Sequence, residues 1–76
     1  MEATISRSDH LVWCKQRALE YVKMGDIQGA FASMVSDMRK HPGTADHAAL
    51  ELGLMMIMGG HLATRDAMQK FIEGFN

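Results

Sequence analysis

The sequence has only one cysteine and one proline among its 76 residues, and it has no long apolar segment. A single cysteine, Cys14, cannot form an internal disulfide, and the cysteine and histidine spacing is not that of a structural zinc site. The most apolar stretch, residues 52–58, is far shorter than the roughly 20 residues that span a bilayer. Residues 1–9 lack the apolar core of a signal peptide. We therefore expect a cytoplasmic protein that does not enter a membrane.

An excess of charge of either sign is also absent, because eight Lys and Arg residues are matched by nine Asp and Glu residues and the net charge is −1. Nucleic-acid binding depends on a concentrated basic field that neutralises phosphates. The sequence has no such field, and it has no acidic excess that would imitate nucleic acid. We therefore expect no nucleic-acid partner.

The sequence shows no catalytic motif. Cys14 lies on an apolar helical stripe, where burial keeps a thiol protonated and unreactive. Residues 58–64, MGGHLAT, lack the lysine and the spacing of a phosphate-binding loop. The carboxylates that a general acid or base would need are spread singly along the chain, at Glu20, Asp37, Glu51 and Asp66. We expect neither an enzyme nor a bound cofactor.

Asp46, His41 and His47 come nearest to a metal-binding cluster, because they bracket one loop. Histidine ligates metals, but a zinc site also needs a fourth ligand or a bound water in defined geometry. His61 would join only if the next loop folded back. We interpret these residues as loop and capping residues and expect no metal.

Apolar residues recur with the 3.6-residue period of helices in four segments, which predicts an all-α fold of four short helices in one domain, residues 1–76. The first helix is expected to follow a cap at Ser8 or Asp9 and to run to about Met24, with residues 1–7 as a frayed lead-in.

Gly25 and Asp26 mark a tight corner before the second helix. Glycine suits the left-handed position just past a helix end, and an Asp side chain accepts hydrogen bonds from the free amides that open the next helix. The second helix should end before Pro42. Its expected apolar face consists of Ile27, Phe31, Met34, Val35 and Met38.

The third helix is expected to begin at a cap on Thr44 or Asp46 and to end at residues 59–60, which are both glycine. Thr64 should cap the fourth helix. Two of the three phenylalanines lie within the last six residues, so we expect the end of the chain to be docked.

The third helix differs from the others because it has no polar face: among residues 48–58 only Glu51 carries a fixed charge. Such a helix is normally buried on all sides. A chain of this size, however, buries only about 60% of its unfolded surface. We therefore expect a central helix, part of whose surface, from Met55, Met56 and Met58, meets another chain.

Trp13 falls on the polar side of the first helix, beside Arg17 and Met24. One interpretation is that the indole folds over the helix or packs on the fourth helix. The other is that it anchors a partner, since tryptophan and arginine are enriched among interface hot spots. The sequence leaves both open.

Ala18, Tyr21, Gly25, Ala30 and Pro42 have the spacing of one tetratricopeptide repeat, and this stretch resembles that helical hairpin. The resemblance implies a helix–corner–helix unit that the remaining two helices complete as a second hairpin. Two positions depart from the pattern. The repeat pattern begins with an aromatic residue, but Cys14 stands at that position here. The pattern also has a small residue late in its second helix, but Asp37 stands at that position here.

Three segments, WCKQRALEY, ALELGLMMIMGGHL and FIEGFN, also resemble a set of short proteins encoded by bacteriophages. This resemblance implies an accessory protein in the host cytoplasm that acts on a host component, such as a defence system. It carries over no catalytic residue.

These features predict a small interaction protein that self-associates, as a dimer, and that inhibits or sequesters a protein partner. One alternative is a small-ligand or nucleotide sponge with a pocket between protomers, lined by Trp13, Tyr21, Arg17 and the loop histidines. Another is a virion or assembly component. The partner-binding residues are expected to be Trp13, Arg17, Met24, Met55, Met56 and Met58.

Overall fold

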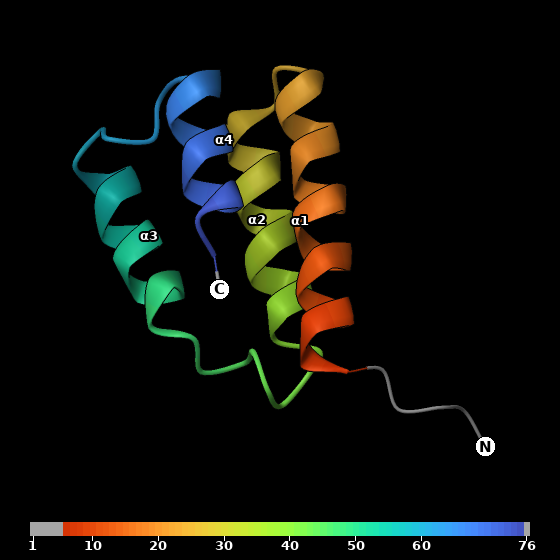
Figure 1. The fold of residues 1–76 in the computed structure, drawn as a ribbon. Coiled ribbons are helices and arrows are strands. Elements are labelled where there is room, and N and C mark those ends of the chain that lie inside the picture. Colours follow the sequence, from red (N-terminus) through yellow and green to blue (C-terminus); the bar gives the residue numbers. More distant parts are fainter. Residues whose placement is uncertain (1–5, 76) are drawn as a thin grey trace.

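The computed structural model describes residues 6–75, which form four helices without a strand (Figure 1). The helices are α1 (Arg7–Lys23), α2 (Ile27–Met38), α3 (Ala48–Met58) and α4 (Arg65–Glu73). The predicted all-α fold of four short helices is confirmed. Within residues 6–75, no helix combines the length and the apolar character needed to cross a membrane.

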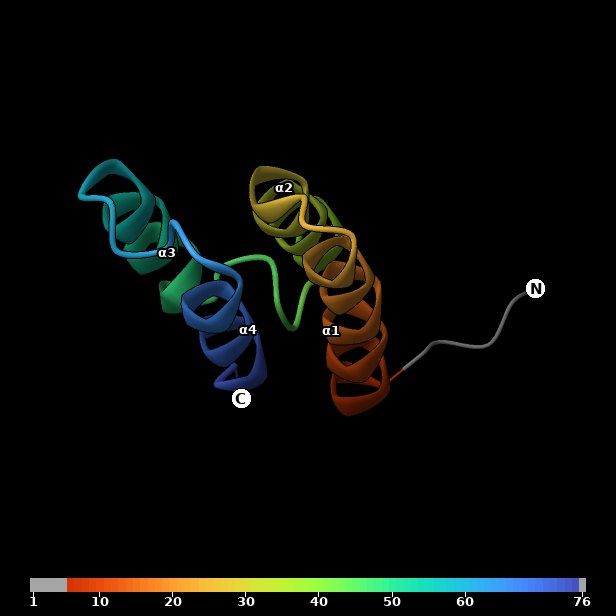
Figure 2. The same ribbon diagram turned by 90° about the horizontal axis from the view of Figure 1, so that it is seen from above.

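A tight corner joins α1 and α2, which lie side by side as a hairpin (Figures 1 and 2). Gly25 has φ 83°, in the left-handed region that favours glycine. The Asp26 side chain then caps α2 by accepting a hydrogen bond of 2.8 Å from the Gly29 N–H. Both roles agree with the sequence-based expectation.

Replacing Asp26 by alanine should lower the free energy of unfolding by about 1 kcal/mol, because a free amide of α2 loses its acceptor. Asp26→Asn is the matched control, since asparagine retains a capping oxygen. Urea denaturation followed by circular dichroism measures both. Equal stability of the two variants would show that the cap contributes nothing.

The first helix begins earlier than predicted. Its N-cap is Ser6, whose hydroxyl accepts from the Asp9 N–H at 3.1 Å. Ser8 and Asp9 therefore lie in the first turn, and the caps predicted there are wrong. Of the expected frayed lead-in, residues 1–5 lie outside the described residues, whereas Ser6 and Arg7 belong to the start of α1.

The cap of α3 also differs, because it is His47 rather than Thr44 or Asp46. The His47 Nδ1 accepts from the Ala49 N–H at 3.1 Å. The buried hydroxyl of Thr44 instead donates to the Met38 carbonyl at 2.6 Å, and so satisfies an acceptor at the end of α2. That hydrogen bond holds the connection between α2 and α3 close to the core.

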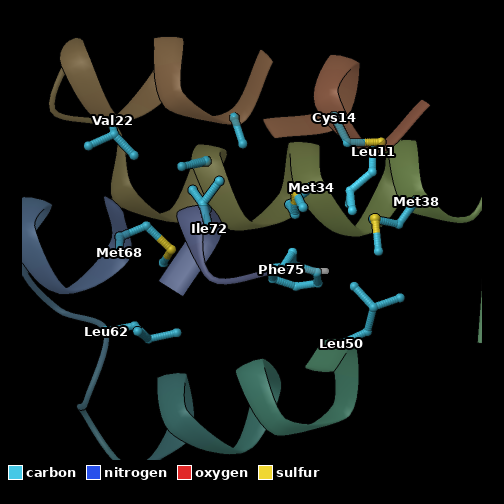
Figure 3. Close-up of a cluster of buried hydrophobic side chains, with 12 residues drawn as sticks. Leu11, Cys14, Val22, Met34, Met38, Leu50, Leu62, Met68, Ile72 and Phe75 are labelled. Atoms are coloured by element: carbon cyan, nitrogen blue, oxygen red, sulfur yellow. The ribbon is translucent and has the colours of Figure 1, made fainter. Parts of the chain in front are cut away.

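The core lies where α4 packs against the α1/α2 hairpin (Figure 3). Met68 and Ile72 are fully buried on α4, and they enter the same cluster as Met34 from α2. Thr64 caps α4 by accepting from the Ala67 N–H at 3.1 Å, as expected. Phe75 is buried just beyond α4, so the predicted docking of the chain end is confirmed.

The position predicted for α3 is wrong, because this helix lies at the edge of the molecule rather than at its centre (Figure 2). Only Leu50 and Gly53 of α3 are buried. The physical reason is that α4 has the sharper apolar stripe. Met68, Ile72 and the following Phe75 occupy the space against the hairpin, and α3 packs outside them.

Candidate functional site

The residues expected to bind a partner lie in separate parts of the molecule. Trp13 and Arg17 are on α1, whereas Met55 and Met58 are on α3, and these two helices occupy opposite sides with α2 and α4 between them (Figure 2). Met24 is exposed at the corner after α1. The structure therefore does not bring the predicted set together as one surface.

The outer face of α3 is an exposed apolar surface, which we call the α3 strip. Four large apolar side chains form it, with exposed fractions of 54% for Leu52, 53% for Leu54, 68% for Met55 and 79% for Met58. Met56 differs, because it is half-buried and packs against the core, so it does not belong to the strip. The surplus apolar surface expected near residues 50–58 is therefore present.

A groove of about 220 Å³ between α2 and α3 continues the strip. The half-buried Phe31 and Val35 of α2 line it on one side, and Leu50 and Leu54 of α3 line it on the other. The two remaining lining residues are a cation at the C-cap of α2, Arg39, and an anion on α3, Glu51. The α3 strip and this groove together form a continuous apolar surface with one charge of each sign.

Gly53 explains how α3 is attached beneath this surface. A Cβ atom placed on Gly53 would lie 2.5 Å from Phe71 Cζ and 2.6 Å from Phe31 Cε1. The backbone of α3 thus rests directly on two aromatic rings, whose centroids are 6.2 Å apart. The inner face of α3 also contributes the buried Leu50 and the half-buried Ala49, Met56 and Ile57, and the opposite face of the helix is left facing outward.

Trp13 is 37% exposed and lies among cations rather than beside α4. The Arg17 Cζ lies 4.8 Å from the centroid of its ring, and the Lys40 Nζ lies 5.6 Å from it. The His10 ring is tilted against it with centroids 5.5 Å apart. The indole therefore folds over a charged cluster between α1 and α2, which accounts for its place on the polar side of α1.

Asp37 lies at the base of this cluster as a buried carboxylate. The sequence alone does not predict that it is buried. It accepts hydrogen bonds from Arg17 Nε at 2.7 Å, from Lys40 Nζ at 3.2 Å and from Ser33 Oγ at 3.4 Å. The hydrogen bond to Asp37 raises the pKa of Arg17. The network compensates the buried charge and ties α1 to α2, so Arg17 already has a structural partner.

Burial raises the pKa of the Cys14 thiol to about 11, with the negative charge of Asp37 as a smaller cause. The folded protein thus holds the thiol proton more tightly than the unfolded chain does. This contribution to stability is complete below the ordinary thiol pKa of 9.0 and is lost as the pH rises toward 11. The structure places Cys14 in the core, as a protonated thiol.

We expect the free energy of unfolding to fall between pH 9 and pH 11 by up to about 1.4 kcal/mol per pH unit from Cys14 alone. Urea titrations across this range measure the slope. Cys14→Ala is the control, because it removes this thiol and leaves every other ionisable group in place. Identical slopes for the two proteins would contradict the assignment.

The loop histidines face different elements. The His41 ring stacks on His10 of α1 with centroids 5.1 Å apart, whereas the His47 ring lies against Phe75 with centroids 5.1 Å apart. Nowhere between residues 6 and 75 do three or more His, Cys, Asp or Glu side chains gather in a way that could hold a metal ion. The geometry thus offers no support for a pocket that combines Trp13 with both histidines.

The sequence indicated Met55 and Met58 of the α3 strip, but it did not indicate Leu52 and Leu54 or the extension of the strip onto α2. The sequence places Phe31 and Val35 on the apolar face of the second helix, and both are half-buried at the edge of the core. The buried residues of α2 are Ala30, Met34, Asp37 and Met38. The apolar face of this helix is broad, and its outer part borders the groove.

Comparison of the chain with protein-family models, with curated proteins and with solved structures finds no match. The shape, the apolar character and the charges of the α3 strip and its groove are therefore the observations that indicate a function.

Proposed function

We propose that this chain is a small, non-enzymatic protein-interaction module that docks a protein on the α3 strip and the adjoining groove. The observation that carries the proposal is the exposure of Leu52, Leu54, Met55 and Met58, each more than half exposed on one short helix. Exposed apolar side chains scattered singly are normal on a protein surface. A contiguous set beside an apolar groove is typical of a binding surface.

Docking on this surface has a clear driving force. Fully burying a large apolar side chain contributes about 1.5–3 kcal/mol, so covering the exposed half of each side chain in the strip contributes about 1 kcal/mol. Met55 and Met58 add adaptability, because a flexible thioether side chain adjusts to the shape of its partner. The strip is thus suited to the apolar stripe of a partner helix or to a similar apolar surface.

The resemblance to short bacteriophage-encoded proteins supplies a biological setting for the proposal. In that setting the chain inhibits or sequesters a component of the host cell. Occlusion needs no catalytic group, only a surface that holds its target.

Site-specific photo-crosslinking tests the proposal. A photoreactive residue at Met55 should give discrete protein adducts in host-cell extract, identified by mass spectrometry. The matched control carries the same residue at Gln69, which is exposed on α4 and lies outside the strip. Absence of protein adducts at Met55, or the same adducts at both positions, would overturn the proposal.

A further inference from the structure

We infer that a second copy of this chain occupies the α3 strip, in a dimer with two-fold symmetry in which Arg39 of each copy faces Glu51 of the other. The inference rests on the proposed function and names the partner. It depends on one juxtaposition: the apolar groove carries a cation on its α2 wall and an anion on its α3 wall.

The charges of the groove make it complementary to itself. In a two-fold interface the same patch meets itself, so that a residue on one wall contacts the opposite wall of the other copy. Both Arg39 and Glu51 are exposed, and neither forms an ion pair with another residue within the described range 6–75. Facing copies therefore form two reciprocal ion pairs around an apolar centre. A strongly acidic or basic partner would satisfy only one of these charges.

The size of the surface agrees with this arrangement. A stable interface buries about 800 Å² on each partner. The accessible surface is 5012 Å², so such an interface takes roughly a sixth of it. At 1.5 Å per residue, the 11 residues of α3 extend over only about 16 Å. The interface therefore includes Phe31 and Val35 of α2 as well as the α3 strip.

The weak attachment of α3 favours a partner that is always present. A helix shorter than about 12–15 residues is marginal by itself, and α3 has 11 residues of which only Leu50 and Gly53 are buried. A second copy is present wherever the chain is made, and it covers the exposed side of this helix. Because α1 lies on the opposite side of the molecule from α3, dimerisation through α3 leaves α1 open to a further protein (Figure 2).

A charge-reversal experiment tests the inference. The variants Arg39→Glu and Glu51→Arg each place like charges opposite one another twice in the dimer. Sedimentation velocity on the full chain over a dilution series should show a dimer for the natural sequence, and a dissociation constant raised about tenfold or more for each variant alone. An equimolar mixture of the two variants should restore the dimer, because every facing pair is then opposite in charge.

Glu20→Arg and Lys23→Glu on α1 are the matched controls, and they should dimerise like the natural chain. Circular dichroism confirms that each variant is folded. A monomeric natural chain at all concentrations, charge variants that dimerise normally, or a mixture that stays monomeric would each overturn the inference. If the natural chain is monomeric while Met55 crosslinks to a different protein, only the second copy is excluded and the proposed function stands.

Discussion

Replacing Ile72 by alanine is expected to remove about 2–5 kcal/mol from the free energy of unfolding. Ile72 is fully buried where α4 meets the α1/α2 hairpin, so the smaller side chain leaves a cavity that the surrounding helices fill only in part. A domain of 76 residues has a total stability of about 4–11 kcal/mol. The loss is therefore a large share of the total stability, and the variant should unfold at a much lower urea concentration than the natural chain.

Urea denaturation followed by circular dichroism measures this loss. Gln69→Ala is the matched control, because Gln69 lies on the same helix but faces solvent. It should change stability by no more than about 0.5 kcal/mol. A loss below about 1 kcal/mol for Ile72→Ala would mean that α4 is not packed as described.

Replacing Gly53 by leucine is expected to detach α3 from the rest of the molecule. Even the Cβ of the new side chain would lie 2.5 Å from Phe71 Cζ and 2.6 Å from Phe31 Cε1, and the remaining atoms have no space between the rings. Overpacking of this kind costs about 1–3 kcal/mol. Because α3 has few other buried contacts, the helix should separate rather than force the core apart.

The expected result is a loss of the part of the helical circular dichroism signal that the 11 residues of α3 contribute, together with a lower free energy of unfolding. Ala48→Leu is the control, since it adds bulk to an exposed position of α3. Leucine also forms helix more readily than glycine, so sequence propensity alone predicts a gain at position 53. A Gly53→Leu variant with intact or increased helix content would contradict the close contact.

Features set by neighbouring residues could be predicted from the sequence. The corner at Gly25 and Asp26 and the cap at Thr64 follow from local backbone chemistry, and the structure shows all of them. The presence of exposed apolar side chains on α3 was also predictable, because residues 48–58 contain more apolar side chains than a chain of this length can enclose.

Features that depend on packing between helices could not be predicted in this way. The edge position of α3 results from competition with α4 for the same face of the hairpin. The cap at His47 arises because Thr44 is drawn toward the Met38 carbonyl. The burial of Asp37 could not be predicted without knowing that Arg17 of another helix reaches its carboxylate. One signal was available, because Asp37 lies three residues after the buried Met34 and so on the same side of α2.

The proposed binding surface depends most on the weak attachment of α3, with its outer face left uncovered in a single copy. Hydrogen–deuterium exchange of the backbone amides, on the natural chain diluted until it is monomeric, tests this most directly. The amides of α3 should exchange through local opening, well before those of α1 and α2, which require global unfolding. Protection of α3 equal to that of α2 under the same conditions would contradict the weak attachment of α3.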